Sequence, residues 1–329
     1  MKTVVRKNWS RKASWRESET GIKPIIGILI LVMLMVIAVG VVFYVSMNIV
    51  GGNDAKKEPL MLIDDYGRTV SVPRDIKKII TFGPSATEVV YSLGLGNRVV
   101  GVDDNSDYPE NAKSKEKIGS FDLQYEKIYS LSPDIIIAAD IISPVAISKI
   151  EEKGIPVFVL SPKSIRDVLQ NIRVVGLMTG TVENASNLTA SLQMRIDTVT
   201  AKLSNANITY QSVYMEYYPY WTYGPGSIGN TLILSAGGIN IASNTTVLYP
   251  ELNNEFIIAA NPDVIVYTVG PWTTTTVDDI KNRPGWSAIN AVKNDRIYTI
   301  DDNIVVRPGP RIVDALEQLA AIIHPEVFK

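Results

Sequence analysis

The stretch KKIITFGPSATEVVYSLGLGNRVVGVDD, residues 77–104, decides the fold because it contains a complete strand–helix–strand unit. KKIITF and RVVGVDD are short β-branched runs of the kind that form buried strands. Between them, Ser85 and Glu88 fit a capping box at the start of a helix, and Gly94 suits the left-handed position after its end. Two strands joined by a helix predict a parallel sheet.

The same alternation continues on both sides of this unit. Upstream, LMLIDDYGRTVSV (60–72) alternates around Asp-Tyr-Gly and predicts a β-hairpin. Downstream follow a helical turn, a buried strand, a second helix and a further strand: EKIYSLSP (126–133), DIIIAAD (134–140), AISKIEEKG (146–154) and PVFVL (156–160). Residues 59–163 are therefore predicted to form an α/β lobe with a mostly parallel sheet.

A helical segment follows this lobe. Residues 164–206 keep a helical pattern with no strand signal. The α/β alternation then resumes with the strand QSVYMEYY (211–218), the loop YWTYGPGS (220–227), a helix through TLILSAGG (231–238), the strands DVIVYT (263–268) and RIYTI (296–300), and the helix RIVDALEQLAAII (311–323). We predict a second α/β lobe over residues 207–329, so two lobes flank one long helical segment.

The N-terminal region predicts a membrane anchor. Residues 24–53 carry no charged side chain, and about 20 apolar residues suffice to cross a bilayer, so residues 24–50 are long enough for a transmembrane helix. Residues 1–23 form a basic head with seven basic and two acidic side chains, a charge of +5. We expect this head in the cytoplasm, residues 51–58 as a linker and the lobes outside the cell. A buried core helix is the alternative for the apolar run.

The residue inventory excludes several functions. With the head at +5 and the whole chain at −2, the exterior part carries about −7, which argues against a nucleic-acid binder. The chain has no cysteine, which excludes disulfides, thiolate metal sites, a thiol nucleophile and a thioether-linked lipid. Its single histidine, His324, lies in the tail, and HExxH, GxSxG and P-loop motifs are absent. A binding module is favoured over an enzyme or a structural subunit of a surface assembly.

An internal similarity supports the two lobes. YEKIYSLSPDIII (125–137) and NEFIIAANPDVIV (254–266) both run from a glutamate through an apolar helix to Pro-Asp and a β-branched strand. Glu126 and Glu255 each lie seven residues before the proline of their motif. A Pro-Asp step ends a helix and allows a strand to begin.

The ordered set of motifs carries a family resemblance. Together with the segments above, DDYGRTVSVP (64–73), SDYP (106–109), EKGIPVFVL (152–160) and RPGPRI (307–312) resemble the helical-backbone (class III) periplasmic substrate-binding proteins of ABC importers that serve vitamin B12, ferric siderophores and haem. The resemblance covers residues 59–329. It implies two Rossmann-like lobes bridged by a rigid helix, a ligand in the cleft between them, and an ABC permease and its ATPase as partners.

The N-terminus carries a resemblance of its own. GIKPIIGILILV (21–32) behind its basic head is similar to archaeal class III (pilin-type) signal sequences, which implies cleavage near Gly21. An uncleaved signal anchor is the alternative.

Aromatic side chains and helix-start turns are the candidate ligand contacts. The turns Gly83–Ser85 and Gly224–Ser227 suit helix N-termini at the ligand-binding edge of each sheet, so Ser85 is a candidate. Tyr214 and Tyr217 fall within a strand pattern and are expected in the core. The remaining aromatics of this region lie near strand ends and suit stacking on a flat or apolar chelate: Tyr218, Trp221, Tyr223 and Trp272.

The family resemblance adds further ligand candidates. Trp221, Tyr249 and Phe121 fall where vitamin B12-binding members place aromatic side chains. Ala139 stands where a corrinoid-binding tryptophan is expected, which weakens a corrinoid assignment.

Two arginines flank the RPGP turn. Arg307 could bind an anionic chelate through its planar fork, and a surface or structural ion pair is the alternative for it. Arg311 opens the last helix, where a cation needs a partner, so it is expected in a structural ion pair. The single tail histidine disfavours a bare transition metal as cargo. A ferric siderophore is the first choice, a corrinoid the second and haem the third. We expect no resident cofactor or metal and a monomeric chain.

The resemblance also implies a docking role for Glu126 and Glu255, since members of this family place a carboxylate on each lobe against arginines of the permease. Some members place the first-lobe glutamate later, near the position of Pro144. A carboxylate that simply suits the first turn of a helix is the alternative for both residues.

Overall fold

The computed structural model describes residues 58–270, 273 and 275–328. The basic head, the predicted transmembrane run and nearly all of the linker lie outside the described residues, as does Trp272. Within the described part of the chain, no helix is both long enough and apolar enough to cross a membrane.

The first lobe is built on a five-stranded parallel sheet in the order β5-β4-β3-β6-β7. Strands β3, β6 and β7 are buried along their whole length, as apolar runs of a covered parallel sheet should be. The strands are β3 (Ile79–Phe82), β4 (Val99–Val102), β5 (Glu116–Lys117), β6 (Ile135–Ala139) and β7 (Val157–Leu160). The helices are α2 (Pro84–Ser92), η1 (Glu110–Ser114), α3 (Tyr125–Leu131) and α4 (Pro144–Glu151). The predicted hairpin is confirmed as the antiparallel pair β1 (Leu60–Ile63) and β2 (Thr69–Val72).

The start of α2 differs from the prediction. Gly83 is the N-cap, with no side-chain cap bond, and Pro84 occupies the first turn. The predicted capping box of Ser85 and Glu88 is wrong, because a proline suited to the first helical position starts the helix earlier and places Ser85 inside it. At the other end Gly94 adopts φ +78°, which confirms the predicted left-handed residue.

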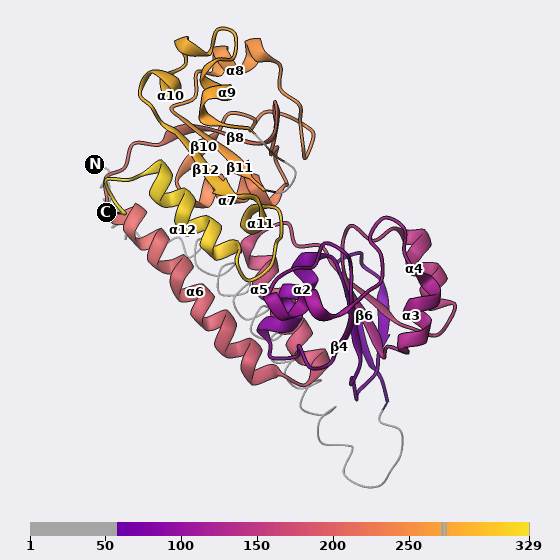
Figure 1. The fold of residues 1–329 in the computed structure, drawn as a ribbon. Coiled ribbons are helices and arrows are strands. Elements are labelled where there is room, and N and C mark those ends of the chain that lie inside the picture. Colours follow the sequence, from indigo (N-terminus) through magenta and orange to yellow (C-terminus); the bar gives the residue numbers. More distant parts are fainter. Residues whose placement is uncertain (1–57, 271–272, 274, 329) are drawn as a thin grey trace, which may run out of the picture. The chain divides into compact units, whose positions relative to one another are not determined.

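The predicted helical segment between the lobes contains two helices. α5 (Ile165–Thr179) ends at Gly180, which adopts φ +74°, and α6 (Val182–Asn205) begins two residues later. The two helices pack against each other, and α6 also packs along α12 (Ile312–Ile323) of the second lobe (Figure 1). The bridging helix is therefore α6, whereas the prediction treated the whole segment as one pattern.

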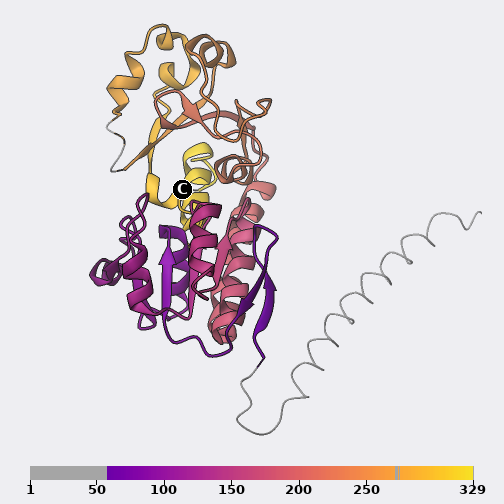
Figure 2. The same cartoon turned by 90° about the vertical axis from the view of Figure 1, so that its right-hand side faces the viewer.

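The second lobe repeats the layout of the first. Its sheet has the parallel order β10-β8-β11-β12, and β9 pairs antiparallel with β8 inside the predicted loop. The strands are β8 (Gln211–Tyr218), β9 (Trp221–Thr222), β10 (Gly238–Asn240), β11 (Val264–Val269) and β12 (Ile297–Asp301). The helices are α7 (Ile228–Ser235), α8 (Asn254–Ala260), α9 (Val277–Lys281), η2 (Trp286–Ala288), α10 (Asn290–Lys293), α11 (Asp302–Val305) and α12 (Ile312–Ile323). Figure 2 shows the two lobes one above the other.

The internal similarity seen in the sequence is also structural. Ser132 after α3 and Asn261 after α8 both adopt a left-handed conformation, with φ of 48° and 45°. The following aspartates then accept backbone N–H groups at the base of a neighbouring strand: Asp134 Oδ2 from Lys78 at 2.8 Å, and Asp263 Oδ2 from Ser212 at 3.0 Å. α3 and α8 therefore occupy equivalent places in the two lobes.

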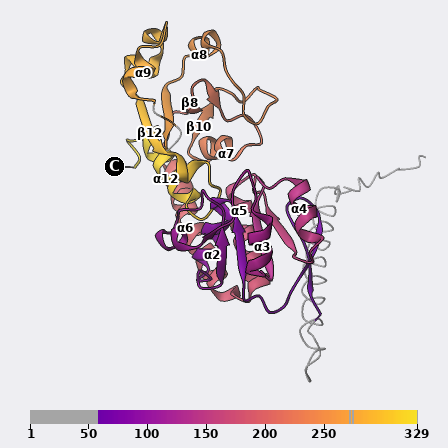
Figure 3. The ribbon, with the colours of Figure 1, turned by 45° about the vertical axis from the view of Figure 1, so that its right-hand side comes forward.

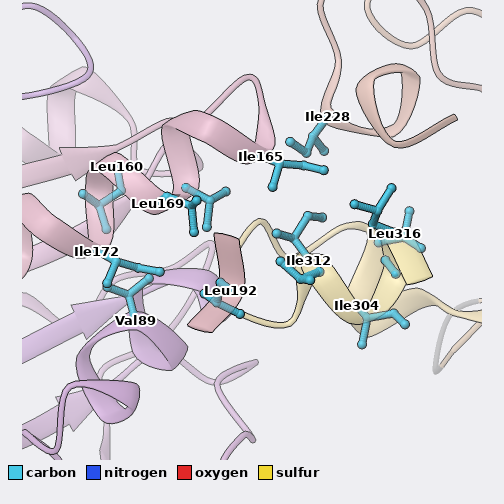
Figure 4. Close-up of a cluster of buried hydrophobic side chains, with 14 of the residues drawn as sticks. Val89, Leu160, Ile165, Leu169, Ile172, Leu192, Ile228, Ile304, Ile312 and Leu316 are labelled. Carbon is cyan, nitrogen blue, oxygen red and sulfur yellow. The ribbon is translucent and has the colours of Figure 1, made fainter. Parts of the chain in front are cut away.

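One buried apolar cluster runs through both lobes. It includes Val89 of α2 and Ile172 of α5 in the first lobe, Leu192 of α6, and Ile312 and Leu316 of α12 in the second. Figure 4 shows these side chains on helices of both lobes, with Leu192 of α6 between the two groups. The lobes are thus joined by shared core packing as well as by the bridging helix.

Candidate functional site

A cavity of about 270 Å³ lies at the carboxyl edge of the second sheet. It is lined by Tyr217, Tyr223, Ile228, Tyr249 and Val306. Tyr217 lies near the end of β8, Ile228 begins α7 and Val306 follows α11. Ligands of parallel α/β sheets bind at this edge.

The three tyrosines form one aromatic wall. The ring centroids of Tyr217 and Tyr223 are 5.1 Å apart, and Tyr249 stands edge-on to both at 6.0 and 6.2 Å. Tilted and edge-on pairs at these separations are favourable by about 0.5–1.5 kcal/mol each. The wall is therefore a preformed surface that can stack against an apolar or flat part of a ligand.

The hydroxyl groups of this wall are neutral donors. Burial raises the pKa of Tyr217 and Tyr249 above the usual tyrosine value and raises that of Tyr223 well above it. The Tyr223 hydroxyl is buried and has no hydrogen-bond partner among the described residues. A buried donor without a partner is costly, so a ligand oxygen that accepted from Tyr223 would relieve a real deficit.

Close backbone packing holds the wall in place. The N–H of Gly224 donates to the carbonyl of Leu248 at 2.8 Å, and a Cβ on Gly224 would lie 2.0 Å from the Val247 carbonyl oxygen. The Asn240 side chain donates to the carbonyl of Tyr223 at 2.6 Å. Only glycine at position 224 lets the loop that carries Tyr249 lie against the loop that carries Tyr223.

The first lobe contributes the facing side of the junction. The Thr231 hydroxyl of α7 donates to the carbonyl of Lys163 at 3.3 Å, and the charges of Asp140 and Lys163 act on the Tyr249 hydroxyl. Figure 3 shows α7 at the end of the second lobe that adjoins the first. The carboxyl ends of β6 and β7 therefore adjoin the tyrosine wall.

A buried polar network positions the helix-start turn of the first lobe. The N–H of Gly83 donates to Asp103 Oδ1 at 2.9 Å, and Asp103 also accepts from the Ser106 hydroxyl. Gly83 adopts φ +94°, and a Cβ there would lie 2.6 Å from the Cβ of Ala139. The small residue at 139 thus packs directly against the turn that begins α2.

Two arginine–carboxylate pairs join the lobes. Arg311 contacts Glu88 of α2 through two hydrogen bonds of 2.6 and 3.0 Å and lies 3.9 Å from the centre of the Tyr108 ring. Burial raises the pKa of Glu88, with Arg311 acting in the opposite direction. Arg307 contacts Asp107 at 2.5 Å. The predicted structural pair of Arg311 is confirmed.

A larger hollow of about 920 Å³ lies elsewhere on the second lobe. It is lined by the end of α6, the start of β8 and the C-terminal tail. Arg296 at its edge is occupied with Gln211 and with carbonyls at the end of α12. This hollow is at the amino ends of the strands, away from the ligand-binding edge of an α/β sheet.

Comparison with known proteins identifies the fold's family. The periplasmic binding protein family matches residues 79–304. The chain belongs to this family. An uncharacterized ABC transporter substrate-binding lipoprotein of Bacillus subtilis, YvrC, is 33% identical over 82% of this chain and 87% of the relative. The vitamin B12-binding protein of Vibrio cholerae is 29% identical over 76% of this chain and 90% of its own length.

A solved structure supports the same assignment. A possible iron-binding periplasmic solute-binding protein of Staphylococcus epidermidis superposes with a TM-score of 0.67 at 29% identity, covering 76% of this chain and 99% of that protein. Membership in a family of periplasmic binding proteins confirms the interpretation of the chain as a binding module.

The structure of this periplasmic binding protein brings some of the predicted ligand residues together. Tyr223 and Tyr249 line the cavity, and Arg307 and the buried Ser85 lie at the lobe junction. Trp221 and Tyr218 pair across β9 and β8, where Tyr218 is 57% exposed. Phe121 is fully exposed and lies apart from the cavity lining. In the described part of the chain, no cluster of three or more His, Cys, Asp or Glu could hold a metal ion.

Three cavity residues were not among the predicted ligand contacts: the apolar Ile228 and Val306, and the aromatic Tyr217. Tyr214 is fully buried in the core as predicted, but Tyr217 is only partly buried and lines the cavity. The two tyrosines are three residues apart on β8, so they point to opposite faces of the sheet. Side chains two residues apart on a strand share a face, so Tyr217 lies on the face of Val213 and Met215, beside Tyr223. This alternation along β8 could have separated Tyr217 from Tyr214 in the sequence.

Proposed function

We propose that the chain is the extracytoplasmic substrate-binding component of an ABC importer, which captures a metal chelate between its lobes and delivers it to the permease and its ATPase. The tyrosine-lined cavity at the carboxyl edge of the second sheet carries this proposal. A ferric siderophore is the favoured cargo. The iron-binding description of the Staphylococcus epidermidis structure supports this cargo. The ABC transporter description of the Bacillus subtilis relative supports the importer role.

A corrinoid is the alternative cargo, because the Vibrio cholerae relative is a vitamin B12-binding protein. The packing of Ala139 against Gly83 argues against it, since no large aromatic side chain occupies this position on the first lobe. A cavity of about 270 Å³ admits only the edge of either chelate, so most of the ligand would lie between the lobes.

The binding test uses the full-length chain in detergent. Tryptophan fluorescence is followed during titration with cyanocobalamin, several ferric siderophores and haem, with iron-free siderophores and free Fe³⁺ as controls for quenching. We expect saturable submicromolar binding of one ferric siderophore. Binding of cyanocobalamin alone would establish the corrinoid alternative, and no binding of any chelate would refute the proposal.

We propose that residues 24–50 tether the protein as a single-pass transmembrane helix, with the N-terminus in the cytoplasm and the lobes outside the cell. The Bacillus subtilis relative is described as a lipoprotein, whereas this chain has no cysteine to carry a thioether-linked lipid. An apolar helix supplies the same tethering by different chemistry. Protease protection in oriented membrane vesicles tests this topology, and mass spectrometry of the mature N-terminus tests cleavage near Gly21.

We further propose that Glu126 and Glu255 dock the lobes onto the permease. Both are exposed in the first turns of α3 and α8, which occupy equivalent places in the two lobes. Glu255→Arg should leave chelate affinity unchanged and impair uptake into proteoliposomes or cells. Glu152→Arg, at an exposed position after α4, is the matched control and should retain uptake. Equal uptake by Glu255→Arg and the parent would remove Glu255 from the interface.

A further inference from the structure

Three basic side chains at the lobe junction are matched by carboxylates. Arg311 pairs with Glu88 at 2.6 Å, Arg307 with Asp107 at 2.5 Å, and Lys163 with Asp140 at 3.0 Å. Each pair brings one positive and one negative charge to the junction. These six groups therefore add no net charge to the site that a ligand would meet.

The cavity wall is uncharged as well. Its lining consists of three tyrosines, one isoleucine and one valine. Burial raises the pKa of each tyrosine, so their hydroxyls keep their protons at neutral pH. Two acids act on the wall: Asp140 on Tyr249 and Asp302 on Tyr223, and burial raises the pKa of Asp302. The described wall therefore offers hydrogen-bond donors and apolar surface without a compensating cation.

We infer that the cleft selects metal chelates with no net negative charge. This inference rests on the proposed function and names the charge class of its cargo. Three hydroxamates carry one negative charge each and neutralise Fe³⁺, and cyanocobalamin is also neutral overall. Three catecholates carry two negative charges each and leave a ferric complex at −3, which is costly to desolvate beside a neutral wall. The charge of about −7 on the exterior part of the chain adds long-range repulsion of such a trianion.

The Arg307–Asp107 pair offers a way to change the proposed selection against anionic chelates by mutation. The Arg307 side chain is 12% exposed, whereas Asp107 is 47% exposed at the edge of the junction. Asp107→Asn would remove the compensating charge and leave a guanidinium free to attract an anion. In the wild type the same guanidinium has N–H groups beyond the one that binds Asp107, and these can donate to a neutral hydroxamate or amide oxygen.

The experiment is isothermal titration calorimetry on the full-length chain in detergent at low ionic strength. The probes are ferrichrome (neutral), ferrioxamine B (positive), cyanocobalamin (neutral) and ferric enterobactin (−3). We expect at least one of the first three to bind at least tenfold more tightly than ferric enterobactin. Comparison of ferrichrome with cyanocobalamin shows whether the neutral chelate that binds is a ferric siderophore or a corrinoid.

Variants test the mechanism of the discrimination. Asp107→Asn should tighten ferric enterobactin binding about tenfold and change ferrichrome binding less than twofold. Asp104 is an exposed aspartate three residues away, and Asp104→Asn is the matched control. This variant should bind ferric enterobactin and ferrichrome with unchanged affinity. Tighter binding of ferric enterobactin than of the uncharged or cationic chelates in the wild type would overturn the charge rule and leave the proposed function standing. No binding of any chelate would overturn both.

Discussion

The buried pair of Glu88 and Arg311 allows a quantitative test of the lobe junction. The side chain of Glu88 is 2% exposed and that of Arg311 is 19% exposed, and they share two hydrogen bonds. Arg311→Met keeps an unbranched side chain of similar length but leaves the Glu88 carboxylate buried without a cation. Breaking a buried pair in this way typically costs 3–5 kcal/mol. Because Arg311 keeps some solvent contact, we expect the free energy of unfolding to fall by about 3 kcal/mol at pH 8, the lower end of this range.

The pH dependence of this loss has a definite sign. Burial already raises the pKa of Glu88 above the ordinary glutamate value of 4.5, and loss of Arg311 removes the group that opposes this shift. In the variant, the folded state therefore binds a proton more readily than the unfolded state does. The loss of folding stability in the variant should be absent below pH 4.5 and should grow as pH rises. It should be complete once pH exceeds the raised pKa of folded Glu88.

Urea denaturation of wild type and variant between pH 5 and 8 measures the change in the free energy of unfolding. Thermal unfolding is a second measurement, in which a loss of 3 kcal/mol should lower the midpoint by roughly 6 °C or more. The double variant Glu88→Leu/Arg311→Met removes both charges and should recover most of the stability, because an apolar replacement leaves no unpaired ion. Arg74→Met, on an exposed arginine whose side chain donates to the Glu58 carbonyl, is the control. A pH-independent loss below 1 kcal/mol, additive with Glu88→Leu, would refute the reasoning.

Two further predictions concern the tyrosine wall. Tyr223→Phe should weaken chelate binding about fivefold by calorimetry, since one hydrogen bond contributes about 1 kcal/mol, yet leave the thermal midpoint unchanged or higher because the hydroxyl has no partner among the described residues. A lower midpoint with unchanged affinity would contradict a ligand role for that hydroxyl. Gly224→Ala should cost at least 2 kcal/mol in urea denaturation, because its Cβ would lie 2.0 Å from the Val247 oxygen. Gly154→Ala meets only open space and should cost about 1 kcal/mol of left-handed strain, so equal losses would contradict the packing argument.

The sheets were predictable because their signals are local. β3, β6 and β11 are β-branched runs bounded by proline or glycine, and each lies where the sequence placed it. The Pro-Asp steps also recur in space, since both aspartates accept backbone N–H groups beside the strands that they precede. Gly180 was a local signal for the break between α5 and α6, but the surrounding helical period outweighed it.

The junction was not predictable because its contacts join distant positions. Glu88 and Arg311 are 223 residues apart, and Arg307 and Asp107 are 200 apart. From sequence alone Glu88 fitted a capping box. Only the fold shows that its carboxylate instead forms a buried ion pair with Arg311. The aromatic candidates were right in type, but their solvent exposure depends on which loops pack together, as the contrast between Tyr223 and Phe121 shows.

The shared core limits how the cleft can work. Parting the lobes would expose side chains that now pack across the junction, among them Ile165 of α5 and Ile228 of α7, which lie side by side in Figure 4. Burying one aliphatic side chain contributes about 1.5–3 kcal/mol, so exposing these two with Ile312 would cost at least about 4.5 kcal/mol. A state at that cost is populated in about one molecule in two thousand. The cleft is therefore preformed, and affinity must come from the fixed tyrosine wall and the matched ion pairs rather than from closure. Crystals grown with and without a bound chelate should then differ by a small lobe rotation, whereas a large hinge closure would contradict a shared core.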